Sequence, residues 1–170
     1  LEEWRDWNGL LHIVAHNVSH FSSLDAIWID PAASEDVANP AALAHGIRLL
    51  IADDDAAILL LLNKTLSRLG YEVFTAVDGR QAMDQFSAHA PHMVISDAIM
   101  PIIGGLDLCR AIRRTASARS VYFILLTAHA EKGHLVEAFQ AGVDDFITKP
   151  VNAKILLGRL AAGTRIARLQ

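Results

Sequence analysis

The sequence predicts an α/β protein built on a five-stranded parallel sheet with helices on both faces. After residue 46, short apolar runs alternate five times with helical patterns. These runs are too apolar for strands with one wet face, and strands buried on both sides are typical of parallel sheets. Right-handed crossovers then place the helices on both faces. The expected fold is therefore a doubly wound (βα)5 domain.

The elements follow from where the apolar runs and the turn residues fall. Strands are expected over residues 47–52, 71–77, 93–96, 121–126 and 144–148. Helices are expected over residues 58–69, 79–89, 105–114 and 131–140, and from residue 152 towards 170. Gly70 is the predicted stop of the first helix, and Asn152 is the predicted N-cap of the last.

Composition limits the class of protein. Of the 170 residues, 52% are hydrophobic, which is enough for a core, and the net charge of -4 argues against a nucleic-acid-binding surface over the whole molecule. No apolar run approaches a bilayer span, and no signal peptide is recognised. The single cysteine, Cys109, excludes an intrachain disulfide framework and fits a reducing compartment. We therefore expect a cytoplasmic protein without membrane contact.

The chain divides into two compositionally different parts. The first 46 residues carry seven acidic side chains against one arginine, and they hold all three tryptophans, Trp4, Trp7 and Trp28. Residues 31–45 are rich in alanine and contain two prolines, as linkers often do. We expect an N-terminal extension over residues 1–30, a linker over 31–45 and the main domain, with an extended last helix, over 46–170.

The N-terminal extension has a heptad pattern that predicts a helix. Apolar residues alternate in steps of three and four along it, at Trp4, Trp7, Leu11, Val14, Val18 and Phe21. The interpretations are the end of an upstream domain, a dimerisation helix or a cap on the face around the fourth helix and the fifth strand. Three histidines, His12, His16 and His20, recur every fourth residue away from this seam, and we interpret them as exposed rather than as metal ligands.

Polar side chains follow the predicted strands at their carboxyl ends. They are Asp53, Asp54, Asp97, Thr127 and Lys149. In a parallel sheet these positions share one edge, where ligands bind. Three carboxylates in one place repel one another unless a cation neutralises them, and hard oxygen ligands suit Mg²⁺, with Mn²⁺ as the alternative.

The same residue set matches the needs of phosphoryl transfer. That reaction requires cations on the phosphoryl oxygens and a nucleophile held in line. Lys149 supplies a second positive charge, Thr127 supplies a hydroxyl donor, and Asp97 is the natural nucleophile, giving an aspartyl phosphate. The alternative for Asp97 alone is a carboxylate that caps a loop.

Four motifs in this order resemble the receiver domain of bacterial two-component response regulators. They are Asp53-Asp54-Asp55, the run Asp97 to Pro101, Thr127-Ala128 and Lys149-Pro150, and the resemblance covers about residues 46–165. It implies a flavodoxin-like strand order of 2-1-3-4-5.

The resemblance also implies a role for each site residue. Asp97 would be the phosphoacceptor, and Asp53, Asp54, Asp97 and the backbone carbonyl of Ile99 would hold Mg²⁺. Thr127 would be the switch hydroxyl, Lys149 would pair with the phosphoryl group, and Phe146 would be the aromatic ring that moves inward with Thr127. The alternative for Phe146 is a permanently buried core ring.

Two residues flank the path by which water attacks the phosphorylated Asp97. Ile99, two residues after the acceptor, cannot orient water by hydrogen bonding, so we expect slow hydrolysis. His129, two residues after Thr127, is either a water-positioning group or an exposed loop histidine, and we favour the second interpretation.

The expected function is a phosphorylation-controlled signalling switch rather than an enzyme, with only self-catalysed phosphoryl transfer and slow autodephosphorylation. The expected partner is a sensor histidine kinase or a phosphotransfer protein. A homodimer could form through the face of helix 4, strand 5 and helix 5 or through the N-terminal helix. No direct contact with nucleic acid is expected. The alternatives are a phosphorylation-independent interaction module and a Mg²⁺-dependent phosphohydrolase. The second needs a carboxylate where Ile99 stands. The chain also fits a fragment of a longer regulator.

Overall fold

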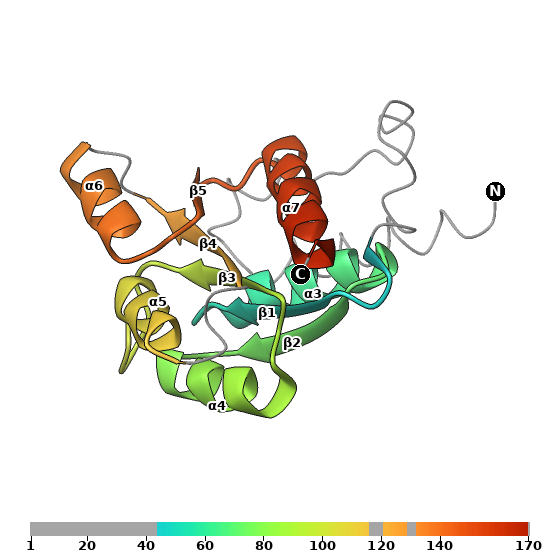
Figure 1. Ribbon diagram of the computed structural model, residues 1–170, viewed down its shortest axis with the longest axis horizontal. Coiled ribbons are helices and arrows are strands. Elements are labelled where there is room, and N and C mark those ends of the chain that lie inside the picture. The colour runs from blue at the N-terminus through green and yellow to red at the C-terminus, as the bar shows by residue number, and fades with distance from the viewer. Residues whose placement is uncertain (1–43, 116–120, 129–131, 170) are drawn as a thin grey trace.

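The computed structural model describes residues 44–115, 121–128 and 132–169 of the chain (Figure 1). The strands are β1 (Arg48–Ala52), β2 (Glu72–Ala76), β3 (Met93–Asp97), β4 (Tyr122–Thr127) and β5 (Asp145–Thr148). The helices are α3 (Ala56–Arg68), α4 (Gly79–His89), α5 (Gly105–Arg113), α6 (Lys132–Gln140) and α7 (Ala153–Arg168). Strands and helices alternate along the chain, as the sequence predicted.

The five strands form one parallel sheet in the order β2-β1-β3-β4-β5. This order confirms the doubly wound, flavodoxin-like fold. The central strand β3 is buried at every position, and β1 and β4 are almost as completely covered. Continuous apolar runs form such strands because side chains on both faces contact helices.

Helices cover both faces of the sheet in two separate layers (Figure 1). One core cluster joins the sheet to α3 and α7, through residues such as Leu62 and Leu160. The other joins it to α4, α5 and α6, through residues such as Phe86, Ile112 and Ala138. Two buried faces fix the register of each strand, and this fixes which residues reach the carboxyl edge.

Local signals begin and end the helices near the expected residues. The Asp55 carboxylate caps α3 and accepts hydrogen bonds from the backbone of Ala57 and Ile58. Asn152 caps α7 as predicted and accepts from the backbone of Lys154 at 2.9 Å. Gly70 follows α3 with a φ of 92°, in the left-handed region that favours glycine.

Some predictions fall on residues that the structure does not describe. The helix and histidines of residues 1–30 lie outside the described residues, as do His129 and all of the linker up to residue 43. Ala44 is fully buried in the core cluster that contains Ile47. Across the described part of the chain, every helix is too short or too polar to cross a membrane.

Candidate functional site

The predicted site residues meet at the carboxyl edge of the sheet. Asp97 and Thr127 are the last residues of β3 and β4, while Asp53 and Lys149 directly follow β1 and β5. The register brings Asp97 opposite Leu126 and Thr127 opposite Thr148 on the neighbouring strands. The parallel pairing therefore gathers residues that lie far apart in the sequence.

Lys149 joins two of the carboxylates. Its Nζ lies 3.0 Å from Asp97 Oδ2 and 3.5 Å from Asp53 Oδ2. Its backbone amide donates to the Thr127 carbonyl at 2.8 Å, which fixes where the side chain starts. Burial opposes the charge on this amine, but the hydrogen bond that it donates to Asp97 and the negative charge of Asp53 raise its pKa overall. Lys149 is therefore a firmly protonated cation at the acceptor carboxylate.

Asp53 is the most enclosed acid of the site, with no exposed surface. Burial raises its pKa above the ordinary value, and the like charge of Asp97 adds to the rise. The backbone amide of Asp55, which donates to Asp53 Oδ1 at 2.9 Å, and the charge of Lys149 oppose it. The carboxylate is held in place, yet its negative charge is only partly compensated.

The three aspartates fit a small divalent cation. One oxygen each of Asp53, Asp54 and Asp97 lies within 4.8 Å of the others, and Asp54 is exposed to solvent. Carboxylate oxygens with open access for water are the ligands that Mg²⁺ uses, and Mn²⁺ accepts the same set. The donor set and its excess negative charge thus agree with the predicted metal site.

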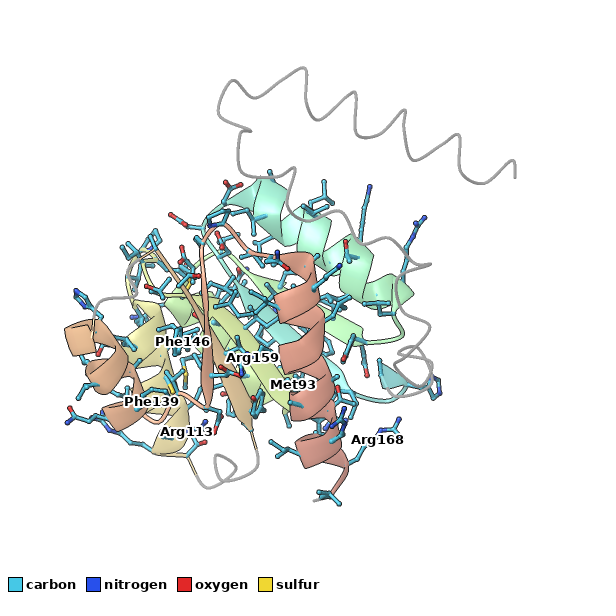
Figure 2. All side chains as sticks on the ribbon, turned by 90° about the horizontal axis from the view of Figure 1, so that it is seen from above. Met93, Arg113, Phe139, Phe146, Arg159 and Arg168 are labelled. Atoms are coloured by element: carbon cyan, nitrogen blue, oxygen red, sulfur yellow. The ribbon has the colours of Figure 1, made fainter. Side chains whose placement is uncertain are left out.

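The predicted switch residues lie on the neighbouring strands β4 and β5. Thr127 is buried at the end of β4, whereas Phe146 is half-buried on β5. The Phe146 ring packs edge-to-face on Phe139 of α6, with ring centroids 6.2 Å apart (Figure 2). Ile99 is 69% exposed after the acceptor strand. Its hydrocarbon side chain has no donor or acceptor, so it offers no hydrogen bond to water there.

Sequence reasoning missed two residues that support the site. A Cβ at Gly105 would collide with the Asp97 carbonyl oxygen and with Leu125, so only glycine lets α5 begin there. The Gly105 amide also donates to the Ala98 carbonyl at 3.0 Å. The signal was the Gly104-Gly105 pair, which the sequence showed only as a break before the helix. Phe139 gave no signal, because its contact with Phe146 depends on how α6 packs.

Comparison with known proteins agrees with this fold and this arrangement of residues. Residues 49–161 match the family model of the response regulator receiver domain. The chain therefore belongs to this family, whose members act in two-component systems. This membership is consistent with a role in phosphorylation-controlled signalling.

Particular relatives support this assignment. The chain is 37% identical over 116 residues to response regulator MprA of Mycolicibacterium vanbaalenii, which covers 68% of this chain and 49% of that protein. It is 37% identical over 113 residues to the probable transcriptional regulator ycf27 of Galdieria sulphuraria, covering 66% and 43%. The crystal structure of a putative response regulator from Chloroflexus aurantiacus has a TM-score of 0.65 at 30% identity, covering 70% of this chain and 98% of that one. The chain spans about half the length of the curated relatives that it matches.

Proposed function

We propose that this chain is a phosphorylation-controlled switch in which Asp97 accepts a phosphoryl group from the phosphohistidine of a histidine kinase or phosphotransfer protein. The observation that carries the proposal is the position of the Asp97 carboxylate. It lies 3.0 Å from the Lys149 ammonium and within 4.8 Å of oxygens of Asp53 and Asp54, at the open edge of the sheet.

The chemistry follows from these neighbours. A carboxylate oxygen of Asp97 attacks the phosphorus atom, the phosphorus–nitrogen bond of the donor breaks, and the imidazole leaves with its electron pair. Lys149 would stay close to Asp97 and neutralise charge on the transferred group. Its ammonium pairs with the Asp97 carboxylate, and its backbone amide is bonded to the Thr127 carbonyl. Receiver domains are not enzymes in the usual sense, and the chemistry of this chain would be this transfer followed by slow hydrolysis, in which water attacks the phosphorus, inorganic phosphate is released and the Asp97 carboxylate is restored.

Asp53, Asp54 and Asp97 would hold Mg²⁺, or Mn²⁺ in its place, with the backbone carbonyl of Ile99 as the further ligand implied by the family. When bound, the metal would neutralise charge on the phosphoryl oxygens. Asp53 is held by the Asp55 amide and Asp54 is open to solvent, so the protein provides one fixed ligand and one accessible ligand.

The proposed output is a change at Thr127 and Phe146. The Thr127 hydroxyl would donate to the phosphoryl group, and Phe146 would move inward into the space that Thr127 leaves. Phe146 has no hydroxyl, so its two positions differ mainly in buried apolar area and in the contact with Phe139. That contact joins β5 to α6, so the face formed by α6, β5 and α7 would change with phosphorylation.

This face is the proposed site for a partner or for a homodimer. The expectation that this chain makes no direct contact with nucleic acid stays a prediction, because a relative of about twice its length is named as a probable transcriptional regulator. A phosphorylation-independent module is less well supported, since the acids and the lysine are in contact.

The proposal is tested by incubation with acetyl phosphate and Mg²⁺, followed by Phos-tag electrophoresis. The parent chain should shift, and the shift should vanish with EDTA. Asp97→Asn should not shift, whereas Asp107→Asn, the same change at an exposed position on α5, should behave as the parent does. A phosphorylated species in Asp97→Asn would refute the assignment.

Ile99 is expected to lengthen the life of the phosphoryl group. Its exposed apolar side chain cannot orient the attacking water, whereas an amide can donate and accept hydrogen bonds. Ile99→Asn should therefore lose its label severalfold faster, measured as decay on Phos-tag gels after removal of acetyl phosphate. Ile102→Asn, at an equally exposed residue of the same loop, is the control. Equal decay in Ile99→Asn and the parent would contradict the expectation.

A further inference from the structure

The outward face of α7 carries an apolar stripe that no described residue covers. Ile155, Ile166 and Leu169 are 49%, 42% and 87% exposed on this helix and at its C-cap. With Arg159 and Ala162 they recur in steps of four and three, the spacing of a helix–helix seam. The opposite side of α7 packs on the sheet. The stripe is therefore a second face that is suited to another helix.

Basic residues border this stripe. Residues 153–168 contain four basic side chains and no acidic one. Lys154 and Arg165 form no ion pair within the described part of the chain, and Arg159, which lies within the stripe, pairs with Asp145. A helix that covers the stripe should therefore be acidic. A second copy of α7 is disfavoured, because like charges would then face each other.

The chain enters the domain beside the end of this helix. Ala44 is fully buried in the same core cluster as Leu160, and Ala167 packs against that cluster. The Arg168 guanidinium donates to the His45 carbonyl at 3.4 Å, and Figure 2 shows Arg168 at the C-terminal end of α7. Residues 1–43 are therefore attached next to the C-terminal end of the stripe.

The sequence of the attached segment complements the stripe. Its apolar seam from Trp4 to Phe21 would extend about 26 Å as a helix, against about 21 Å from Ile155 to Leu169. The first 46 residues carry seven acidic side chains and one basic one. Length, spacing and charge all agree, although these residues lie outside the part that the structure describes.

We infer that residues 4–21 dock as a helix, antiparallel, on the outward face of α7 of the same chain. Antiparallel packing brings the acidic start of the segment, Glu2, Glu3 and Asp6, to Arg165 and Arg168. Residues 31–43 can extend to about 43 Å, more than the roughly 24 Å length of α7, so the linker allows this direction. The short tether also favours the segment of the same chain over that of another copy.

Tryptophan fluorescence tests this inference directly. All three tryptophans lie in the first 28 residues, with Trp4 and Trp7 inside the docked segment, so the emission of the full chain reports on this part of the chain alone. Ile166→Asp and Leu169→Asp place a charge in the stripe, and each should lower the ratio of docked to undocked segment about tenfold. The expected result is emission at longer wavelength and stronger quenching by acrylamide. Val136→Asp, at an exposed residue of α6, is the matched control and should behave as the parent does.

The test uses the unphosphorylated protein, so its outcome does not depend on whether Asp97 accepts a phosphoryl group. Leu169 is 87% exposed, so its replacement should leave the fold intact, which circular dichroism checks. Unchanged emission in both α7 variants would overturn the inference. A shift in Val136→Asp alone would place the segment on α6 instead and also overturn it. A shift that depends on protein concentration would show exchange between chains and contradict docking within one chain.

Discussion

The two ends of the parallel sheet handle charge in opposite ways. At the amino end of β5, Asp144 pairs with Arg113 at 2.6 Å and Asp145 pairs with Arg159 at 2.9 Å, so each carboxylate has its own guanidinium. At the carboxyl end, three aspartates lie close together, and Lys149 pairs with two of them, Asp53 and Asp97. Figure 2 shows Arg113 on α5 and Arg159 on α7, reaching the sheet from opposite faces.

The difference separates structural charges from functional ones. At the amino end, Arg113 also donates to the carbonyls of Gly142 and Val121, and Asp144 accepts from the Phe123 amide. These bonds tie α5 to the loops around β4 and β5. At the carboxyl end, the excess of negative charge stabilises nothing by itself, and it becomes favourable only when a cation and a phosphoryl group are bound.

The largest effect on stability is expected from breaking the ion pair of Arg113 and Asp144 at the amino end of the sheet. Arg113→Ala removes an ion pair and two hydrogen bonds to backbone carbonyls and leaves Asp144 without its cation. We expect a loss of about 2–3 kcal/mol in the free energy of unfolding, measured by urea denaturation. The neighbouring exposed Arg114→Ala should change it by less than about 0.5 kcal/mol. Equal effects of the two variants would show that the pair is not structural.

Mg²⁺ should stabilise the protein by binding to the aspartates at the carboxyl end of the sheet. At 100 times its dissociation constant, Mg²⁺ should raise the free energy of unfolding of the parent by about 2.7 kcal/mol. Asp54→Asn should lose most of this gain while folding normally, because Asp54 is exposed. Asp107→Asn should keep it. If Asp54→Asn retained the full stabilisation, the aspartate cluster would not be the metal site.

A smaller effect on the free energy of unfolding is expected from protonation of His92, which precedes β3 at the amino end of the sheet. Its Nδ1 accepts a hydrogen bond from the Arg48 amide at 3.0 Å, and burial lowers its pKa below the ordinary 6.5. The unfolded chain then binds the proton more readily than the folded one, so stability should fall as the pH drops below about 6.5. His92→Gln should flatten this part of the profile of stability against pH. The same slope in His92→Gln and the parent would contradict the expectation.

The fold and the main site could be predicted because both depend on short-range patterns. Apolar runs set the strands, and the predicted helix over 79–89 has the same bounds in the structure. In a parallel sheet the residues that follow the strands lie at the same carboxyl edge, so the prediction of a parallel sheet also placed Asp97 near Lys149.

Other features depend on packing between distant elements and left no local pattern. An arginine on α5 that reaches Asp144 has the same sequence signature as one that points into water, as the pair Arg113 and Arg114 shows. The contact of Phe139 with Phe146 and the tight approach of Gly105 to Asp97 also appear only when the helices are placed. Helix periodicity identifies a buried face, but it does not identify which side chain lies opposite.

The assignment of Asp97 as the phosphoacceptor is tested by comparing Asp→Asn changes at the two ends of the sheet. The intact masses of the parent, Asp97→Asn and Asp144→Asn would be measured after treatment with acetyl phosphate and Mg²⁺. The parent and Asp144→Asn should each gain a single phosphoryl group, and Asp97→Asn should gain none. A phosphoryl group on Asp97→Asn, or its loss from a folded Asp144→Asn, would contradict the assignment of Asp97 as the phosphoacceptor.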